Sequence, residues 1–201
     1  MRNLGRVSDN EMIIAFLQAE IDSPRFRGSV DSALSNAGTN RSIVTTPNLQ
    51  SEEENRLRRR ALGLYRGFGQ NRALFLDFPQ DVRWYKVLLD KDDLKKLRYL
   101  NYPTWEELSG GSRLVTDGAQ NVDRIHTDEN TNATIKSIAD AVRQGKRYPG
   151  LILVSDKLEG TLTLVEGNAR ATAYLLELDA IDDGIEAIVG YSEAIRQWRF
   201  H

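Results

Sequence analysis

The chain has 201 residues, of which 40% are hydrophobic and 28% are charged, and it contains two histidines and no cysteine. A chain of this length forms one domain, or one domain with an additional lobe, and its core needs no disulfide or structural metal. The lack of cysteine excludes disulfide frameworks, thiolate zinc sites, iron–sulfur clusters and cysteine nucleophiles, and two histidines are too few for the usual histidine-based metal site.

Charge is nearly balanced, with 27 basic and 29 acidic side chains, which is not the composition of a wholly basic nucleic-acid-binding protein. The basic residues are 20 arginines and 7 lysines. Arginine suits carboxylate and phosphate ligands, although coding bias in a GC-rich genome explains the excess more simply. No apolar run is long enough to span a membrane, and the segment MRNLGRVSDNEM lacks the apolar core of a signal peptide. We therefore expect a cytoplasmic protein without a membrane partner.

Two capped helices are predicted in the first third of the chain. Ser8 followed by Glu11 is a capping box, and Ser51 with Glu54 forms a second N-terminal cap. The segment between these helices is polar and aperiodic, which is typical of a loop. The predicted elements are a helix over about 9–21, a long loop over 25–50 and a helix from 51 to about 66.

The middle of the chain is less regular. An aromatic and aliphatic stretch predicts a strand at 83–88, followed by a short helix from about 90 to 100. Pro103 marks a further helix start, with Thr104 and Glu107 as the capping pair. Residues 109–113 form the turn after that helix, and residues 115–132 show no clear element.

The last third alternates helices and strands. Apolar spacing predicts a helix over about 133–144, and the run Leu-Ile-Leu-Val is typical of a buried strand. Ser192 is expected to cap the last helix. The predicted elements are strands at 151–154, 161–165 and 185–189, and helices at 169–178 and from 192 to about 198. We therefore predict an α+β protein with an N-terminal helical lobe over 1–80 and an α+β domain over 81–201.

The strand–turn–helix segment over residues 161–178 carries the strongest functional signal. Gly167 follows the strand directly and permits close approach of a ligand to the backbone. The helix N-terminus beyond it offers unpaired N–H groups to an anion, and Arg170 would add a guanidinium fork. Glu166 could hold a metal, a ribose hydroxyl or a substrate proton. The alternative is a plain turn in which Asn168 caps the helix and Arg170 pairs with Glu166, and spacing alone leaves both open.

Three stretches, 145–154, 162–164 and 166–174, resemble the ParB/sulfiredoxin-like superfamily in order and spacing. The resemblance covers about residues 133–190. It implies a compact mixed sheet with flanking helices and a turn that binds nucleotide phosphate. Gly167 falls on the glycine of the family motif and Arg170 on its phosphate-binding arginine. Asn168 stands where sulfiredoxin has its cysteine, which excludes that reductase activity, and Ala169 stands where many members have histidine.

The resemblance implies a protein that binds a nucleotide or phosphorylated ligand, such as ATP, ADP or CTP with Mg²⁺. An enzyme of this kind would transfer a phosphoryl group or hydrolyse a nucleotide, with Glu166 as metal ligand or base. The alternatives are a non-enzymatic nucleic-acid- or protein-binding component of a mobile-element or defence system, and a degenerate member that keeps the fold for interaction. A homo-oligomer is compatible with each. The ligand-binding residues would be Gly167, Asn168, Arg170, Thr172 and Arg113.

Arg113 enters this set through the glycine-rich stretch Ser109–Arg113. Successive backbone N–H groups of such a stretch can converge on a phosphate, and Arg113 would supply a second phosphate contact. A helix C-cap explains the two glycines more simply.

The densest group of arginines lies between residues 56 and 72, interleaved with aromatic residues. Arg58, Arg59 and Arg60 are the candidate contacts for nucleic-acid phosphates. The alternative is a solvated helix face paired with residues 52–54.

His126, with Asp123 and Asp128 near it in the sequence, is the remaining candidate for metal or acid–base chemistry. A surface histidine is the simpler explanation, and we predict no metal site there. A single internal histidine also argues against a Ser–His–Asp triad.

Overall fold

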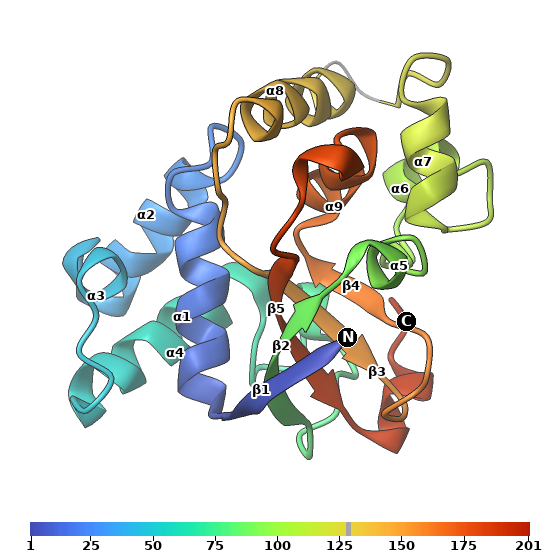
Figure 1. Cartoon of the computed structure of the whole chain (residues 1–201). Coiled ribbons are helices and arrows are strands. Elements are labelled where there is room, and N and C mark those ends of the chain that lie inside the picture. Colours follow the sequence, from blue (N-terminus) through green and yellow to red (C-terminus); the bar gives the residue numbers. More distant parts are fainter. Residues whose placement is uncertain (128–129) are drawn as a thin grey trace.

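A mixed β-sheet with helices on both sides forms the frame of the molecule (Figure 1). The computed structural model describes residues 1–127 and 130–201, and within these ranges the sheet has five strands in the order β1-β2-β5-β3-β4. β3 and β5 pair in parallel, and the other neighbours pair antiparallel. The strands are β1 Arg2–Val7, β2 Arg83–Leu89, β3 Leu151–Ser155, β4 Thr163–Glu166 and β5 Ile185–Tyr191. The predicted α+β class is confirmed.

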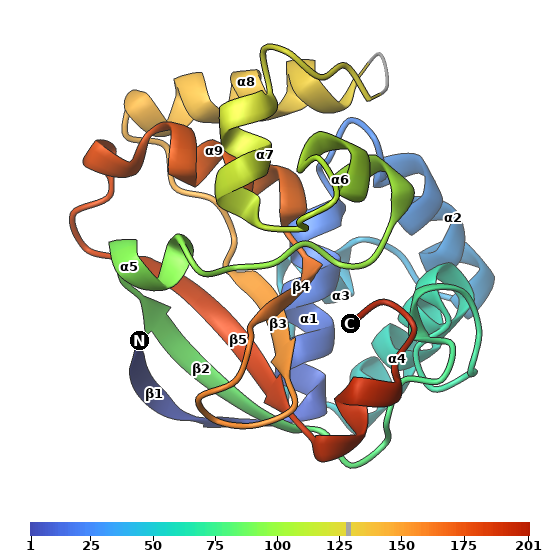
Figure 2. The ribbon, with the colours of Figure 1, turned by 90° about the vertical axis from the view of Figure 1, so that its right-hand side faces the viewer.

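The helices divide between the two faces of the sheet (Figure 1 and Figure 2). α1 Asp9–Glu20, α2 Arg27–Ala37, α3 Ser42–Thr45 and α4 Glu52–Arg66 pack on one face. The other face carries α5 Lys91–Leu94, α6 Pro103–Leu108, α7 Val115–Asn121, α8 Thr131–Arg143 and α9 Asn168–Leu176. Short 3₁₀ helices lie at Ala73–Phe75, Leu178–Ala180 and Glu193–Gln197.

β3 is buried on both faces, so its successive side chains enter different cores. Leu151 and Leu153 belong to the core under α5–α9, whereas Ile152 and Val154 pack with α1–α4. The continuous apolar run of this strand follows from that double burial.

The predicted loop over 25–50 is wrong, because α2 and α3 lie within it. Val30, Ala33, Leu34 and Ala37 form a buried stripe at helical spacing. The stripe is surrounded by Ser, Asn and Gly, which have weak helix propensity, and packing overrides that local preference. The helix ends at Gly38, whose φ of +86° is typical of a C-cap.

Several other predicted boundaries are also corrected. β1 was missed because nearly all its residues are exposed, so it shows no alternation of apolar and polar residues. The predicted helix over 90–100 ends at Leu94, and α7 lies in a segment without a predicted element. α6 begins at Pro103 after Tyr102 without the predicted side-chain cap. Ser192 does cap the last helix, but that helix is a 3₁₀ helix.

The N-terminal part of the chain contributes to the sheet as well as to the helices on one face. β1 pairs with β2, and the core under α1–α4 includes Trp84, Ile152 and Val165. The division at residue 80 stays a prediction, but the two parts share a sheet and a core. In the part of the chain that is described, helices capable of crossing a membrane are absent.

Candidate functional site

The strand–turn–helix segment is built around a glycine in the left-handed region. β4 ends at Glu166, and Gly167, with φ +97° and ψ +19°, is the N-cap of α9. A Cβ at this position would lie 2.5 Å from Leu151 Cδ2 and 3.1 Å from Arg170 Nη2. The close packing and the positive φ together require glycine here.

The first turn of α9 is without a side-chain cap among the described residues. Gly167 occupies the N-cap, so Asn168 is the first helical residue and the alternative that made it the N-cap is wrong. The first N–H groups of a helix have no partner within it. Asn168 is 9% exposed, and its Oδ1 is buried without a hydrogen-bond partner in residues 1–127 and 130–201. The turn therefore holds unused hydrogen-bonding capacity.

Arg170 is buried directly behind this turn. Its guanidinium donates to the backbone carbonyls of Pro149 and Gly150 and to the Glu166 carboxylate. The ion pair between Arg170 and Glu166, which the alternative for this segment predicted, is therefore present.

A second ion pair, between helices of the first third, acts electrostatically on Glu166. Glu20 at the end of α1 is 3% exposed, and it accepts a hydrogen bond of 2.5 Å from Arg66 Nη2 at the end of α4. The charge of Arg66 also acts on Glu166, and the Tyr65 hydroxyl lies beside Glu20. We call Glu20, Arg66, Glu166 and Arg170 the arginine–glutamate quartet.

Burial opposes the charged form of both carboxylates in the quartet. Burial raises the pKa of Glu166, whereas the positive charges of Arg170 and Arg66 lower it. Burial also raises the pKa of Glu20 to about 7, with the negative charge of Glu166 adding to the effect and Arg66 opposing it. Protonation of either carboxylate is therefore easier than in water. Sequence reasoning missed Glu20 and Arg66, which come from helices far from residues 161–178.

Thr172 and Arg113, the other predicted ligand contacts, are engaged elsewhere. The buried Thr172 hydroxyl donates to the Asn168 carbonyl and lies 2.6 Å from the Tyr99 hydroxyl. Arg113 donates to the carbonyls of Tyr99 and His201 at 2.8 and 2.9 Å, and burial lowers its pKa. No contact joins Arg113 to the turn within the described ranges.

The stretch around residues 109–113 is a helix C-cap. The Gly111 N–H donates to the Glu106 carbonyl at 2.8 Å, and the Gly110 N–H donates to the Glu107 carbonyl at 3.0 Å. These amides satisfy the last carbonyls of α6. The simpler explanation, a helix C-cap, is therefore confirmed, and the phosphate-binding alternative is wrong because these two N–H groups are already bonded.

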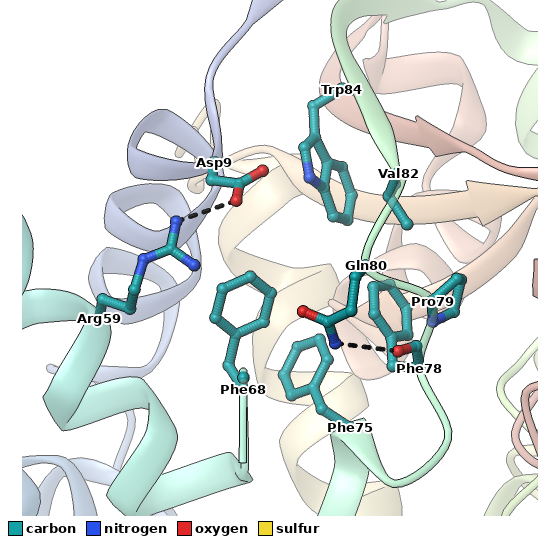
Figure 3. Close-up of a pocket in the computed structure, with 10 residues that line it drawn as sticks. Asp9, Arg59, Phe68, Phe75, Phe78, Pro79, Gln80, Val82 and Trp84 are labelled. Atoms are coloured by element: carbon teal, nitrogen blue, oxygen red, sulfur yellow. Dashed lines mark hydrogen bonds and ion pairs between the residues drawn. The ribbon is translucent and has the colours of Figure 1, made fainter. Parts of the chain in front are cut away.

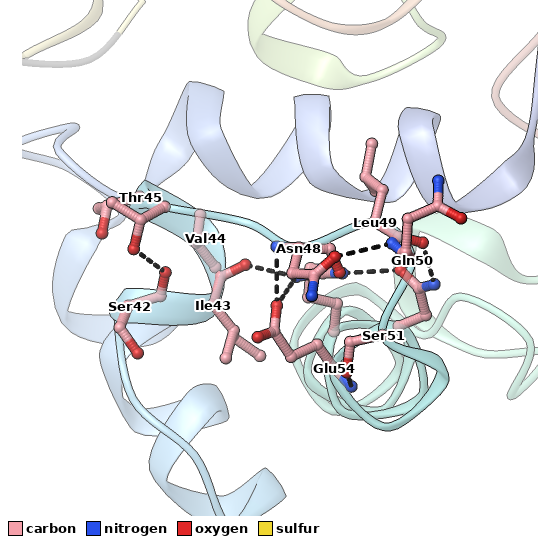
Figure 4. A network of polar contacts seen from close by, with 12 residues as sticks. Ser42, Ile43, Val44, Thr45, Asn48, Leu49, Gln50, Ser51 and Glu54 are labelled. Atoms are coloured by element: carbon pink, nitrogen blue, oxygen red, sulfur yellow. Dashed lines mark hydrogen bonds and ion pairs between the residues drawn. The ribbon is translucent and has the colours of Figure 1, made fainter.

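Arg58, a candidate contact for nucleic-acid phosphates, has a side chain that is only 1% exposed. It donates to the carbonyls of Ile43 and Asn48 and to the side chains of Glu54 and Asn55. The polar groups of Ile43, Asn48 and Glu54 meet around this guanidinium (Figure 4). Arg58 holds α3 and the following loop onto α4, so its predicted phosphate contact is wrong.

Arg59 and Arg60 do reach the surface. Arg59 is half-exposed, pairs with Asp9 at 2.9 Å and lies over the Phe68 ring. Arg60 is exposed, and no ion pair to it occurs in the described part of the chain.

A narrow hollow of about 20 Å³ opens between the Asp9–Arg59 pair and a group of aromatic rings (Figure 3). No local sequence pattern indicates this hollow, because its walls come from distant segments. It has room for about one water molecule. A wider, more open hollow of about 410 Å³ adjoins it and is bordered by the exposed Arg6 and Arg83. The rings at the narrow hollow are Phe68, Phe75, Phe78 and Trp84.

The expected absence of a metal site at His126 stays a prediction. Asp123 pairs with Lys136 at 2.6 Å, and Asp128 lies outside the described residues. Among those residues, no group of three or more His, Asp or Glu side chains is placed to hold a metal ion.

Fold and site together define an α+β protein with a buried Glu166–Arg170 ion pair behind a strand–glycine–helix turn. Comparison of the chain with protein-family models, curated proteins and solved structures finds no match. The resemblance to the ParB/sulfiredoxin-like superfamily therefore rests on the motif residues between 145 and 174.

Proposed function

We propose that the protein binds a phosphorylated ligand, with nucleotides such as ATP, ADP or CTP as the first class to test, at the first turn of α9. The observation that carries the proposal is this uncapped turn with the buried Oδ1 of Asn168, which has no hydrogen-bond partner among the described residues. Backbone N–H groups and the helix dipole favour an anion at such a position. Rotation of the Asn168 amide by about 180° would present its Nδ2 donor to the same point.

Arg170 would supply the positive charge for this ligand. A guanidinium donates in a fixed fork that matches phosphate oxygens. Its present partners are a carboxylate and two carbonyls, which are oxygen acceptors like those of a phosphate.

The residues at the turn do not fit a resident Mg²⁺ ion. Mg²⁺ prefers several oxygen ligands with net negative charge, whereas the carboxylate of Glu166 is compensated by Arg170 and Arg66. Mg²⁺ enters the proposal only as the counter-ion of a nucleotide, and no chemical step is derived through it.

Titration calorimetry with ATP, ADP and CTP, with and without Mg²⁺, tests the proposal. Loss of one charge-assisted or buried hydrogen bond weakens binding by about tenfold or more. We expect that loss for Asn168→Ala and for Arg170→Lys, which keeps the charge but not the fork. Arg113→Lys is the control and should bind as the wild type does. Absence of binding to the wild type, or equal binding by all the variants, would overturn the proposal.

The second candidate function is nucleic-acid binding. It is favoured by the exposed guanidiniums of Arg6 and Arg83 at the wider hollow and by the surface position of Arg59 and Arg60. Arginine contacts to phosphates give salt-dependent affinity. The test is a gel shift at low salt with Arg6→Ala/Arg83→Ala and Arg59→Ala/Arg60→Ala. Unchanged mobility of DNA and RNA with the wild type would exclude this candidate.

A further inference from the structure

The two edges of the sheet differ in what lies beyond them. Beyond β4, the backbone of Arg98 continues the sheet: its N–H donates to the Leu162 carbonyl at 2.9 Å, and its carbonyl accepts from the Leu164 N–H at 2.8 Å. Beyond β1, no further strand is paired within residues 1–127 and 130–201 (Figure 2). Alternate residues of an edge strand turn their N–H and C=O groups away from its one partner. The outer edge of β1 is therefore free to pair with another chain.

The two arginines of β1 lie on opposite faces of the sheet. The register of β1 on β2 shifts once, in the middle of the strand, as in a β-bulge. Arg2 lies opposite Leu88 on β2. Arg6 lies opposite Tyr85, an odd number of positions from Leu88, and successive side chains of a strand alternate between the faces. A strand added beside β1 would therefore have a guanidinium next to each of its faces.

The guanidiniums at this edge have no acidic partner. Arg2, Arg6 and Arg83 are exposed, and no ion pair to any of them occurs in the chain as far as it is described. Arg83 and the residue opposite Arg6 are alternate residues of β2, so these two guanidiniums share a face, and they border the wider hollow. Asp9 also borders that hollow, but its carboxylate is paired with Arg59. The edge therefore carries a net positive charge on both faces.

We propose that the outer edge of β1 is the docking site for an extended acidic segment of a partner protein. The segment adds a strand to the sheet through main-chain hydrogen bonds. Its carboxylates lie beside Arg2 on one face and beside Arg6 and Arg83 on the other. Its aliphatic side chains cover Leu4, which is 45% exposed. This inference is independent of the proposed anion site at α9.

Charge determines which strand fits this edge. A second copy of the chain that paired through its own β1 would bring four arginines onto one short ladder, since each copy contributes Arg2 and Arg6. Like charges across a ladder destabilise it. The bulge and the charged side chains also discourage pairing with strands of unmatched charge. An acidic strand gains on both faces, whereas a nucleic acid would use the guanidiniums but leave the backbone groups of β1 without partners.

NMR titration of the backbone amides of the full chain tests the inference. The probe is an acidic peptide of about six residues, the length of β1, with two adjacent glutamates flanked by valine and threonine. Adjacent glutamates point to opposite faces of a strand. We expect the largest signal shifts in Arg2–Val7. The same peptide with methylated backbone nitrogens keeps its charge but lacks the N–H donors, and it should not bind. Equal binding of the two peptides would overturn the inference, because charge alone would then explain it.

The double variant Arg2→Ala/Arg6→Ala removes one charge from each face at exposed positions. It should bind the acidic peptide about five- to tenfold more weakly. Arg27→Ala/Arg124→Ala removes the same charge from exposed positions outside the edge and should bind as the wild type does. Equal affinity of the two double variants, or no binding by the wild type, would contradict the proposal. Binding of single-stranded DNA that shifts the side-chain signals of Arg6 and Arg83 but not the β1 amides, without peptide binding, would assign this surface to nucleic acid instead.

Discussion

Gly167 takes a backbone angle that residues with a Cβ adopt only under strain. Gly167→Ala would add left-handed strain of about 1–2 kcal/mol and a Cβ 2.5 Å from Leu151 Cδ2. We expect a loss of unfolding free energy of about 2–4 kcal/mol in urea titrations. Gly38→Ala is the control, since φ is +86° there but the described chain leaves open space around a Cβ. Equal losses at both positions would show that a Cβ at residue 167 does not clash with Leu151.

Arg58 is a structural residue, although it lies in the most basic stretch of the sequence. Arg58→Ala would leave the carbonyls of Ile43 and Asn48 without this donor. A buried acceptor left without its donor costs about 1–3 kcal/mol, so we expect a loss of unfolding free energy of about 2–4 kcal/mol, which urea unfolding would measure. Arg60→Ala, at an exposed position of the same helix, should change stability by less than about 0.5 kcal/mol. A small effect of Arg58→Ala would contradict this role.

At the residue scale, contacts close in sequence could be predicted and distant ones could not. The pairing of Glu166 with Arg170 follows from their spacing of four residues. The meeting of Glu20 with Arg66, 46 residues later, depends on how α1 and α4 pack. A partial signal was present, because Glu20 follows Phe16 and Leu17 on the buried stripe of α1, where a charged residue needs a partner.

Among the elements, α1 tests how much a local signal contributes to stability. Ser8 accepts from the Glu11 N–H, and Glu11 reaches back to the Ser8 N–H at 2.8 Å. Ser8→Ala should cost about 1 kcal/mol in thermal or urea unfolding. Ser32→Ala, at an exposed site within α2, should be neutral or slightly stabilising because alanine has the higher helix propensity. A neutral Ser8→Ala would mean that the cap adds nothing to a helix already fixed by packing.

The predicted and missed elements differ in how much of their signal is local. α1, α4 and β3 were predicted because caps or a continuous apolar run define them. α2 and β1 were missed for different reasons. The apolar stripe of α2 lies among residues of weak propensity, and β1 owes its existence to the hydrogen bonds of its partner β2.

For the whole molecule, the quartet makes stability depend on pH. The pKa of Glu20 rises on folding from an ordinary 4.5 to about 7. The folded protein therefore binds this proton more tightly than the unfolded chain does. The resulting contribution is complete below about pH 4.5 and is lost as the pH rises to about 7.

Comparison of the wild type with Glu20→Gln isolates this effect from that of His201, whose pKa burial lowers and whose contribution has the opposite sign. From pH 5 to pH 8 the wild type should lose stability relative to Glu20→Gln, on the order of 2–3 kcal/mol. Urea unfolding across this range measures the difference. Parallel curves for the two proteins would contradict the assignment.

The order of the strands in the sheet also governs how the chain reaches its fold. β2 pairs with β5, and the partners Arg83 and Tyr191 are 108 positions apart in sequence. β1 pairs with β2 across a separation of about 80 residues. Such non-local pairs require large loops to close before any contact compensates for the lost entropy, which makes folding slow. On the ribosome, α1–α4 can form their local contacts early, but their sheet-facing side chains stay uncovered until β5 emerges. The apolar side chains of α1–α4 that pack on the sheet are therefore exposed to solvent during that interval.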